Sequence, residues 1–432
     1  MLQYHMKERL RNFVKKPDSR NVTINTLGNY LNVAFTALFA LVLVRIMSPA
    51  EYGVLSVLLG IAYVLANVLD FGTTATIYSN IPILLENKSQ RLYTFLKTTF
   101  TFQFIFSGTV IIILLFTFPY LDRVFFKTNA PSWELYITSF SILFLIWQNF
   151  ALNVLFAANK FLSANIYNNL QNVIKMIVLF ALIATKTITV GAVLFIYGIL
   201  GPIVFFVLIF FEKKAFILIL SKAAIKKEEF KFGYTATFFF GNQLFNLGGR
   251  MDLFLLSFFS LRNDVGYYGL SQKIILSIVT TVVSITQVLS PKFAKVHTKK
   301  ETLKELRYGF FYLLIPAALF LLLFLTPNGL FYLFFTEKFA KTAYITKLLV
   351  PSYIIFTLGA LPLQFVLYTI KKPGYVLYGN ILYFLIMTLG CYFLIPKLHV
   401  EAPLYVNFVA MLAPVSLISL ATLYEYRKLP QQ

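Results

Sequence analysis

Residues 45–72 read RIMSPAEYGVLSVLLGIAYVLANVLDFG, and half a chain later residues 260–293 read SLRNDVGYYGLSQKIILSIVTTVVSITQVLSPKF. In both stretches a long apolar segment follows a Tyr-Gly pair, which we expect to form a turn where the next helix begins. Tyr52 and Tyr268, the tyrosines of these pairs, are 216 residues apart in a chain of 432. Self-similarity at half the chain length predicts a protein built from two related halves.

The composition indicates a membrane protein. Hydrophobic residues make up 59% of the chain and charged residues 13%, whereas soluble domains carry about 25% charged residues. A bilayer core about 30 Å thick is crossed by a helix of roughly 20 apolar residues. Twelve stretches of about this length occur, at residues 21–44, 52–81, 93–118, 133–157, 162–184, 188–211, 233–258, 266–291, 308–326, 342–369, 374–395 and 402–424. Barrel strands have about 10 residues and alternate apolar with polar residues, so these twelve are predicted to be helices.

The two copies of the motif are predicted to have the same orientation in the membrane. Six spans separate them, and an even number of crossings returns the chain to the same side. Parallel repeats of this kind are related by an axis along the membrane normal. We therefore expect residues 21–211 and 233–424 to form two superposable six-helix lobes. Residues 212–232 between them combine lysines with an apolar face and are predicted to be a cytoplasmic amphipathic linker.

The distribution of basic residues predicts which side each terminus occupies. Residues 1–20 are basic and lack the apolar core of a signal peptide, and residues 425–432 form a short tail. With both termini in the cytoplasm, 26 of the 38 Lys and Arg residues fall on that side, eight on the other and four within spans. This asymmetry follows the positive-inside rule and indicates a multi-pass protein of the cytoplasmic (inner) membrane. Basic loops that face anionic lipid headgroups and maintain the topology explain the net charge of +21. No nucleic-acid partner is therefore predicted.

Motifs for catalysis and for metal binding are missing from the sequence. Cys391 is the single cysteine, which excludes an internal disulfide, and the three histidines fall outside the predicted spans. No glycine-rich phosphate loop, Cys-x-x-Cys pair or nucleophile elbow occurs. The sequence therefore predicts a transporter rather than an enzyme, with no metal site and no cofactor. Whether H+ or Na+ serves as a coupling ion stays open.

Polar residues recur at helical spacing in spans of both halves. Those predicted to line a cavity are Asn25, Asn29, Asn32, Asn67 and Asp70 in the first half and Asn242, Asn246 and Asp252 in the second. Single polar residues in spans also bond neighbouring helices, at about 0.6 kcal/mol each. Polar stripes in corresponding spans of both halves favour instead a water-filled cavity shared by the two lobes.

Three basic residues inside the spans, Lys175, Arg250 and Lys273, are the candidate substrate-binding residues. A charge at the centre of a membrane helix costs at least about 2.5 to 3.5 kcal/mol, so each needs a partner or an aqueous surface. Arg250 and Asp252 are two residues apart and do not share a helix face, so a direct pair is not expected. For Lys175 and Lys273, structural pairing and substrate binding both stay open. The embedded acids are only Asp70 and Asp252, so the cavity is predicted to be net basic, which suits an anionic substrate.

Two stretches of the chain resemble polysaccharide-biosynthesis flippases. Residues 43–72 resemble the first two spans of that family, in which an arginine, a turn with Pro, Glu, Tyr and Gly, and a later Asp-Phe-Gly recur. Residues 250–274 resemble the segment across its spans 7 and 8, with Asp252 and Lys273 in the expected places. This family belongs to the multidrug, oligosaccharidyl-lipid and polysaccharide exporter superfamily, and the overall layout is similar over nearly the whole chain.

This resemblance implies two six-helix lobes around a V-shaped central cavity that opens alternately to each side. The implied cargo is an undecaprenyl-diphosphate-linked oligosaccharide, moved from the inner to the outer leaflet for O-antigen, capsule or exopolysaccharide synthesis. The implied partners are this lipid-diphosphate-linked oligosaccharide, the membrane lipids and the polysaccharide polymerase machinery. Basic residues in the spans agree with such a cargo, because they attract a diphosphate strongly where the dielectric constant is low.

Other functions fit the sequence less well. A cation or drug antiporter of the same superfamily would share the fold but would expose acidic residues that bind its cation. A peptidoglycan-precursor flippase is another relative and typically has two further spans. A membrane glycan polymerase or ligase normally has a large external loop, whereas the longest ones predicted here, near 119–132 and 327–341, have about 15 residues each. A structural subunit would not need charged stripes.

Overall fold

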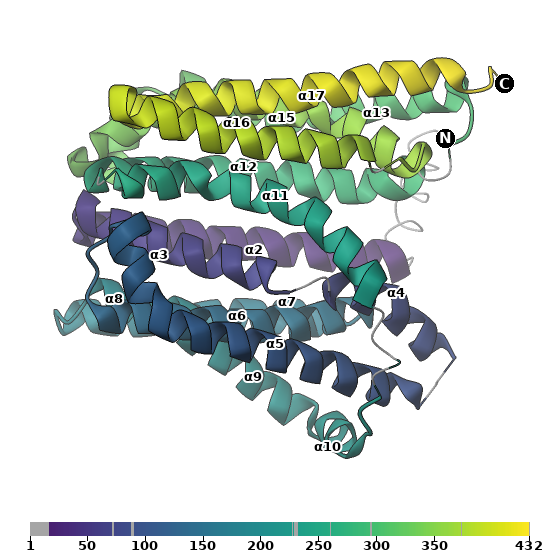
Figure 1. Cartoon of the computed structure of the whole chain (residues 1–432), viewed down its shortest axis with the longest axis horizontal. Helices are drawn as coiled ribbons and strands as arrows, with labels where there is room; N and C mark the ends of the chain where they lie inside the picture. Colours follow the sequence, from purple (N-terminus) through teal and green to yellow (C-terminus); the bar gives the residue numbers. More distant parts are fainter. Residues whose placement is uncertain are drawn as a thin grey trace, which may run out of the picture. The chain divides into compact units, whose positions relative to one another are not determined.

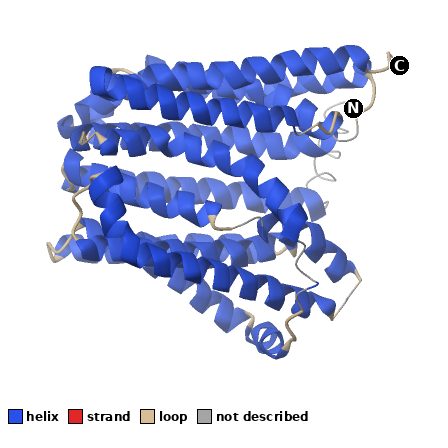
Figure 2. Ribbon diagram, viewed as in Figure 1, coloured by secondary structure: helices blue, strands red, loops and turns tan. Residues whose placement is uncertain are grey.

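The chain is folded almost entirely into helices. The computed structural model describes residues 17–70, 73–87, 90–226, 228, 232–259, 261–293, 296–372 and 374–431. Within these ranges the secondary structure is helical, with short connections and no strand (Figure 2). The prediction of an all-α chain is confirmed.

The first half of the sequence supplies the helices up to α9 (Figure 1). They are α2 (Pro17–Ile46), α3 (Pro49–Val68), α4 (Thr73–Glu86), α5 (Arg91–Leu121), the π-helical turn η1 (Asp122–Phe126), α6 (Ser132–Ala157), α7 (Phe161–Ala184), α8 (Val190–Phe195), the π-helical turn η2 (Ile196–Leu200) and α9 (Gly201–Glu212). The short helix α10 (Lys214–Lys222) lies within the predicted linker.

The second half supplies the remaining helices. They are α11 (Phe232–Phe258), α12 (Arg262–Phe293), α13 (Lys299–Leu325), α14 (Asn328–Phe335), the 3-10 turn η4 (Glu337–Phe339), α15 (Ala340–Gln364), the π-helical turn η5 (Phe365–Thr369), α16 (Gly374–Leu398), the 3-10 turn η6 (His399–Glu401) and α17 (Ala402–Lys428). A capping box of Thr298 and Glu301 begins α13. Helix α17 packs against both α15 and α16.

These helices form two compact units. Unit 1 comprises Met1–Phe39, Leu65–Phe118 and Ser132–Phe239, and unit 2 comprises Ala40–Val64, Pro119–Pro131 and Phe240–Gln432. The end of α2 and most of α3 therefore group with helices of the second half. The predicted lobes follow the two halves of the sequence, whereas unit 2 also contains this segment of the first half.

Each predicted span corresponds to helix, but one span is divided. The stretch 52–81 is two helices, because α3 ends at Val68 and α4 begins at Thr73. The carboxylate of Asp70 accepts the backbone N–H of Thr74 at 3.2 Å. A side chain that accepts from the first turn favours the start of a new helix over continuation of the old one. Asp70 is therefore a capping residue at a break within the predicted span.

The Tyr-Gly pairs are helical, so the prediction of turns at these pairs is wrong. Tyr52 lies in the first turn of α3 and Tyr268 in the second turn of α12. The turn before α3 ends at Ser48, whose hydroxyl accepts the N–H of Glu51 at 3.3 Å. The Glu51 carboxylate in return accepts the N–H of Ser48 at 2.8 Å. This capping box begins the helix ahead of the tyrosine.

Two glycines, Gly53 of the Tyr-Gly motif and Gly266, bring two helices together within unit 2. A Cβ atom added to Gly53 on α3 would lie 2.3 Å from a backbone carbonyl oxygen of α12. A Cβ atom on Gly266 of α12 would lie 2.0 Å from a carbonyl oxygen of α3. Small residues permit backbones to approach this closely. Gly53 of the repeated motif and Gly266 therefore form the contact between the beginnings of α3 and α12.

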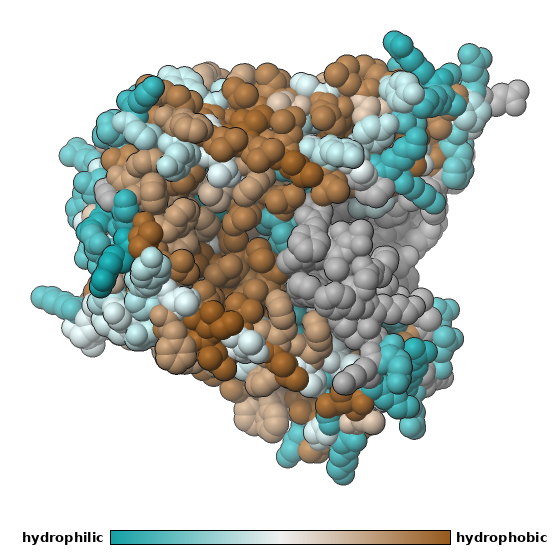
Figure 3. Space-filling view, viewed as in Figure 1, coloured by the Kyte–Doolittle hydropathy of each residue, from teal (hydrophilic) through white to brown (hydrophobic). Residues whose placement is uncertain are grey.

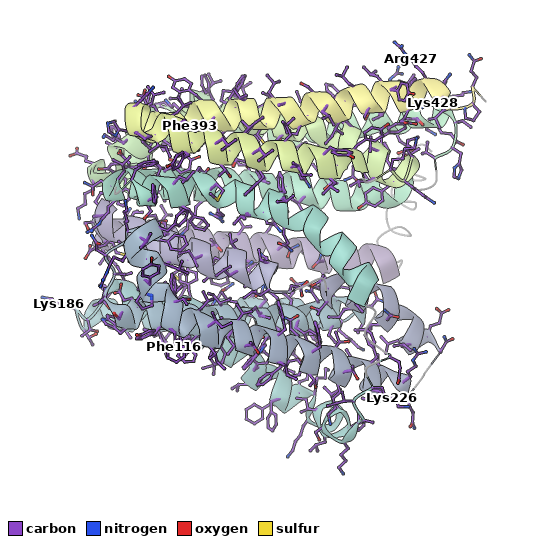
Figure 4. All side chains as sticks on the ribbon, in the orientation of Figure 1. Phe116, Lys186, Lys226, Phe393, Arg427 and Lys428 are labelled. Carbon is purple, nitrogen blue, oxygen red and sulfur yellow. The ribbon has the colours of Figure 1, made fainter. Side chains whose placement is uncertain are left out.

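The exposed surface fits a membrane protein. Among the described residues, nine segments are long and apolar enough to cross a membrane, and the last, Gly374–Lys428, contains both α16 and α17. Helices α11 and α12 have 27 and 32 residues, more than the roughly 20 that a span requires. Phe116 and Phe393 project outward and are 83% and 64% exposed (Figure 4). On the face drawn in Figure 3, apolar residues cover the middle of the helices and hydrophilic residues gather toward their ends.

Candidate functional site

A buried carboxylate, Asp252 on α11, organises the charged residues of unit 2. Its Oδ2 accepts hydrogen bonds from the Tyr268 hydroxyl at 2.6 Å and from the Gln272 amide at 2.8 Å. Its Oδ1 accepts the backbone N–H of Leu253 at 2.7 Å. The side chain is completely buried. Asp252 is thus a buried carboxylate held by three donors.

Gln272 on α12 connects this carboxylate to Arg250. The side-chain oxygen of Gln272 accepts a hydrogen bond from Arg250 Nη1 at 3.1 Å, while its nitrogen donates to Asp252. None of the ion pairs found among the described residues joins Arg250 to Asp252, as expected from their spacing on the helix. Within the described part of the chain this contact uses one of the five guanidinium donors. The half-buried side chain therefore keeps donors for a ligand.

Lys273 brings a second positive charge to the same part of unit 2. Its ammonium lies 5.0 Å from the centroid of the Tyr52 ring, a cation–π contact with α3. Arg250 bonds to Gln272, the residue that precedes Lys273 on α12. We call Arg250, Lys273, Asp252 and Gln272 the unit 2 cluster. Two cations and one carboxylate give this cluster a net positive charge, which suits phosphate binding through charge-assisted hydrogen bonds.

Gln272 is a residue that the sequence analysis missed. It lies four residues after Tyr268, so both donors to Asp252 project from one face of α12. An amide one helical turn from a tyrosine, inside an apolar stretch, is a signal for a buried polar network. Unlike Arg250 and Lys273, Gln272 gives this signal without a charge.

Replacing Gln272 with leucine is expected to lower the thermal stability of the purified protein. Asp252 loses a donor and Arg250 loses its acceptor, and an unsatisfied buried group costs about 1 to 3 kcal/mol. Thermal unfolding in detergent measures this effect. Thr109→Val is the matched control, because Thr109 is exposed and its hydroxyl bonds only its own helix, at Ile105 O. Equal midpoints for Gln272→Leu and the wild type would contradict the bridging role.

In unit 1, asparagines of α7 bind α2 in a row. Asn165 Nδ2 lies 3.3 Å from Asn25 Oδ1, and Asn172 Nδ2 donates to Asn32 Oδ1 at 2.7 Å. Between them Asn169 donates to the carbonyl oxygen of Gly28 at 3.2 Å. Asn25 and Asn32, predicted as lining residues, therefore bond one helix to another, which is the alternative that the sequence left open.

Lys175 continues this row one turn further along α7. Its ammonium donates to Asn172 Oδ1 at 3.2 Å and lies 5.5 Å from the centroid of the Tyr197 ring. Gly201 makes room for the lysine, since a Cβ atom there would lie 2.1 Å from Lys175 Cε. The side chain is 7% exposed. No ion pair of Lys175 occurs among the described residues, so the structure places a buried, unneutralised cation in unit 1.

The remaining predicted lining residues differ in exposure. Asn29, Asn67 and Asn246 are exposed, and Asp70 is partly exposed at the break between α3 and α4. The side chain of Asn242 lies outside the described residues. Among the described side chains no group of three or more His, Cys, Asp or Glu residues could hold a metal ion. The cations and amides described above can bind an anion and hydroxyl-bearing groups.

A family model described as polysaccharide biosynthesis protein matches residues 19–297. This range includes the repeated motif, Lys175 and the whole unit 2 cluster. No protein with a curated description matches the chain at a significant level.

Several solved membrane transporters share the fold. A structure titled lipid II flippase MurJ, inward closed conformation, is 14% identical with a TM-score of 0.72, covering 94% of this chain and 89% of that one. An outward-facing multidrug resistance MATE family transporter of the MOP superfamily is 12% identical with a TM-score of 0.67, covering 96% and 97%. A MOP superfamily transporter from Pyrococcus furiosus, whose title reports a binding pocket of reverse polarity, is 13% identical with a TM-score of 0.65, covering 96% and 98%. The predicted fold class is confirmed by these similarities.

Proposed function

Because the chain belongs to the family of polysaccharide biosynthesis proteins, we propose that it moves an undecaprenyl-diphosphate-linked oligosaccharide from the inner to the outer leaflet of the cytoplasmic membrane. The process is transport by alternating access and forms no new covalent bond. The fold shared with a lipid II flippase and with multidrug transporters supports a transport function of this kind.

The observation that carries the proposal is the pair of cations in the unit 2 cluster. Arg250 bonds to Gln272, which precedes Lys273 in the sequence, and one carboxylate already held by three donors offsets only part of the two positive charges. An anion that binds both cations neutralises this excess positive charge, and the attraction is strong in a medium of low dielectric constant. A diphosphate offers several oxygens and more than one negative charge. We therefore assign Arg250 and Lys273 to the diphosphate of the cargo.

Lys175 is proposed as the corresponding cation of unit 1. Its neighbours Asn172 and Asn32 supply amide groups that suit sugar hydroxyls or phosphate oxygens. The exposed residues Asn29, Asn67 and Asn246 are proposed as polar lining along the path of the oligosaccharide. The lipid tail needs no polar path, because it can remain in the bilayer.

The contact between α3 and α12 is proposed to close one side of the transport path. In the predicted topology both helices begin at the outer side of the membrane. Their backbones touch at Gly53 and Gly266, so a small displacement of either helix would break the contact. Loss of this contact is proposed to open the outer side of the path. Both termini are proposed to be cytoplasmic. The polysaccharide polymerase machinery is proposed to receive the cargo outside.

A cation or drug antiporter is the competing function, because multidrug transporters share this fold. A cationic drug would meet two like charges at Arg250 and Lys273. The two functions differ in their cargo. An antiporter would transport organic cations and would not transport lipid-linked diphosphates.

Translocation in reconstituted vesicles tests the proposal. Vesicles with both leaflets labelled by a diphosphate-linked oligosaccharide are exposed to an added glycosidase that cannot cross the membrane. Purified protein is expected to raise the accessible fraction above that of protein-free vesicles, with every lipid recovered chemically intact before digestion. An unchanged fraction together with transport of an organic cation would overturn the proposal, as would a new covalent glycan product.

A further inference from the structure

The repeated motif places a pair of polar side chains at corresponding positions of α3 and α12. On α12, Tyr268 and Gln272 both donate to the Asp252 carboxylate. At the same spacing of 216 residues, α3 carries Tyr52 and Ser56. The members of each pair are four residues apart, so they project from one face of their helix. All of these residues belong to unit 2, so the two pairs can be compared position by position.

The hydroxyls of Tyr52 and Ser56 have no hydrogen-bond partner among the described residues. Tyr52 is completely buried and Ser56 is 6% exposed. The position that corresponds to Asp252 is Thr36, which has no carboxylate and whose hydroxyl donates to the carbonyl oxygen of Asn32. An unpaired buried hydroxyl shifts an equilibrium by about fivefold or more. The first copy of the motif therefore presents two donors for which the described part of the chain supplies no acceptor.

A positive charge lies beside these hydroxyls. The Lys273 ammonium is 5.0 Å from the centroid of the Tyr52 ring. Ser56 faces the same stretch of α12, because a Cβ atom added to Gly269, one turn before Lys273, would lie 2.8 Å from Ser56 Oγ. Lys273 is half-buried, and none of the ion pairs found among the described residues involves it. An ammonium and two hydroxyls all donate hydrogen bonds, so the three groups suit an oxyanion.

The contact between α3 and α12 covers the two hydroxyls. Gly53, the residue after Tyr52, lies where the two backbones touch. The Tyr52 ring also packs edge-on against Phe339 of η4, with 5.6 Å between the ring centroids. A ligand can reach the hydroxyls only after α3 and α12 separate. Because separation also lets water pair with both hydroxyls, their burial favours opening, and an anion that binds them favours it further.

We propose that Tyr52 and Ser56, together with Lys273, bind the phosphate oxygens of the cargo when α3 and α12 separate. This inference rests on the proposed function. A phosphate oxygen then accepts from the tyrosine and from the residue four positions later, as the Asp252 carboxylate accepts from Tyr268 and its neighbour on α12. Cargo binding stabilises the open form, so the cargo itself promotes opening of the outer side of the path.

Thermal unfolding tests whether the Tyr52 hydroxyl lacks a partner in the protein. Phenylalanine removes the hydroxyl and keeps the ring that contacts Lys273 and Phe339. Tyr52→Phe is therefore expected to unfold at or above the temperature of the wild type. Tyr268→Phe is the matched comparison and should unfold at a lower temperature, because it removes a donor to Asp252. A decrease for Tyr52→Phe would reveal a partner within the protein and would overturn the proposal.

Spin labels at Ala50 and Asn263, at the beginnings of α3 and α12, measure the opening. In the wild type, undecaprenyl diphosphate should reduce the population at short distance, whereas undecaprenol should not. The Tyr52→Phe, Ser56→Ala double variant should show a closed-to-open ratio raised by about fivefold or more without ligand, and no response to the diphosphate. Ser139→Ala is the control and should respond like the wild type, because Ser139 is buried in α6 and its hydroxyl donates to a carbonyl oxygen of its own helix at 3.1 Å. An equal response of the double variant and the wild type would overturn the proposal.

Binding of the same lipids gives a second readout. The double variant should bind undecaprenyl diphosphate about 10-fold less tightly than the wild type, the factor for one hydrogen bond to a charged group, with binding of undecaprenol unchanged. Inorganic diphosphate is the further probe. If it reduces the short-distance population as much as the lipid does, the site takes the free anion and its assignment to the cargo is wrong.

These measurements do not depend on translocation, so the two proposals fail separately. A response that depends on the hydroxyls, in a protein that moves no lipid-linked oligosaccharide in vesicles, would reject the proposed function and keep the anion site. Translocation together with an equal response of the double variant and the wild type would reject the anion site and keep the proposed function.

Discussion

Alanine in place of Arg250 or Lys273 is expected to reduce export of the lipid-linked oligosaccharide by about 10- to 100-fold. Hydrogen bonds to charged groups contribute about 1.5 to 3 kcal/mol, and each 1.4 kcal/mol is a factor of ten in rate. The loss arises because one cation alone attracts the diphosphate less strongly. Surface glycan is measured beside the amount of protein in the membrane, which should stay near the wild-type level. Exchange to the other basic residue should retain part of the activity, since charge is kept while the planar geometry of arginine is lost.

Lys347 provides the matched control for these variants. It lies on α15, and its ammonium donates to Asn328 Oδ1 at 2.8 Å, so Lys347→Ala is expected to export normally. A purely structural role of the unit 2 cations predicts a different pattern. Arg250→Ala would then be poorly inserted or degraded, and removal of Asp252 as well would restore its amount. Normal export by Arg250→Ala and Lys273→Ala at normal expression would reject the diphosphate site.

Valine in place of Gly266 is expected to stop transport by preventing contact between the first turns of α3 and α12. The added Cβ would lie 2.0 Å from a backbone oxygen of α3, and a backbone atom cannot rotate away as a side chain would. Spin labels at Ala50 and Asn263, in these first turns, measure the separation. The wild type should contain a population at short distance, and Gly266→Val should lack it. The single cysteine, Cys391, is buried and does not compete for the label.

Gly108 on α5 is the control for the glycine substitution. No atom lies within 4 Å of a Cβ added there, so Gly108→Val should retain both export and the short-distance population. Gly53→Val should behave like Gly266→Val, because its Cβ would lie 2.3 Å from a carbonyl oxygen of α12. Full export by Gly266→Val with an unchanged distance distribution would show that the contact has no part in transport.

Span positions and the class of fold could be predicted from the sequence, because a membrane imposes a fixed length on every apolar helix. The end of α3 at Val68 could not be predicted from hydropathy, since apolar residues continue on both sides of it. Asp70 is the residue that marks the break, and its capping bond to Thr74 depends on geometry that a hydropathy average does not contain. The Tyr-Gly motif was recognised as a repeat, but its physical basis is a contact between helices rather than a turn.

The candidate site could be predicted only in part. Arg250 and Lys273 were found because charges in membrane spans are costly, and the absence of an Arg250–Asp252 pair followed from helical spacing. Gln272 was missed because a neutral amide leaves no comparable signal in composition. The asparagines of the first half were predicted as a lining, yet Asn25 and Asn32 bind α7. Spacing shows which side chains share a helix face, but it does not show whether that face meets water or another helix.

Binding of undecaprenyl diphosphate to the purified protein is the most direct test of the central claim, that Arg250 and Lys273 hold the diphosphate of the cargo. Undecaprenol, which has the same tail without phosphate, serves as the reference ligand. We expect the wild type to bind the diphosphate more tightly than undecaprenol by at least about 10-fold. This factor corresponds to the free energy of one charge-assisted hydrogen bond. In the Arg250→Ala, Lys273→Ala double variant this preference should disappear, while binding of undecaprenol stays unchanged. Equal binding of both lipids by the wild type, or an undiminished preference in the double variant, would contradict the account.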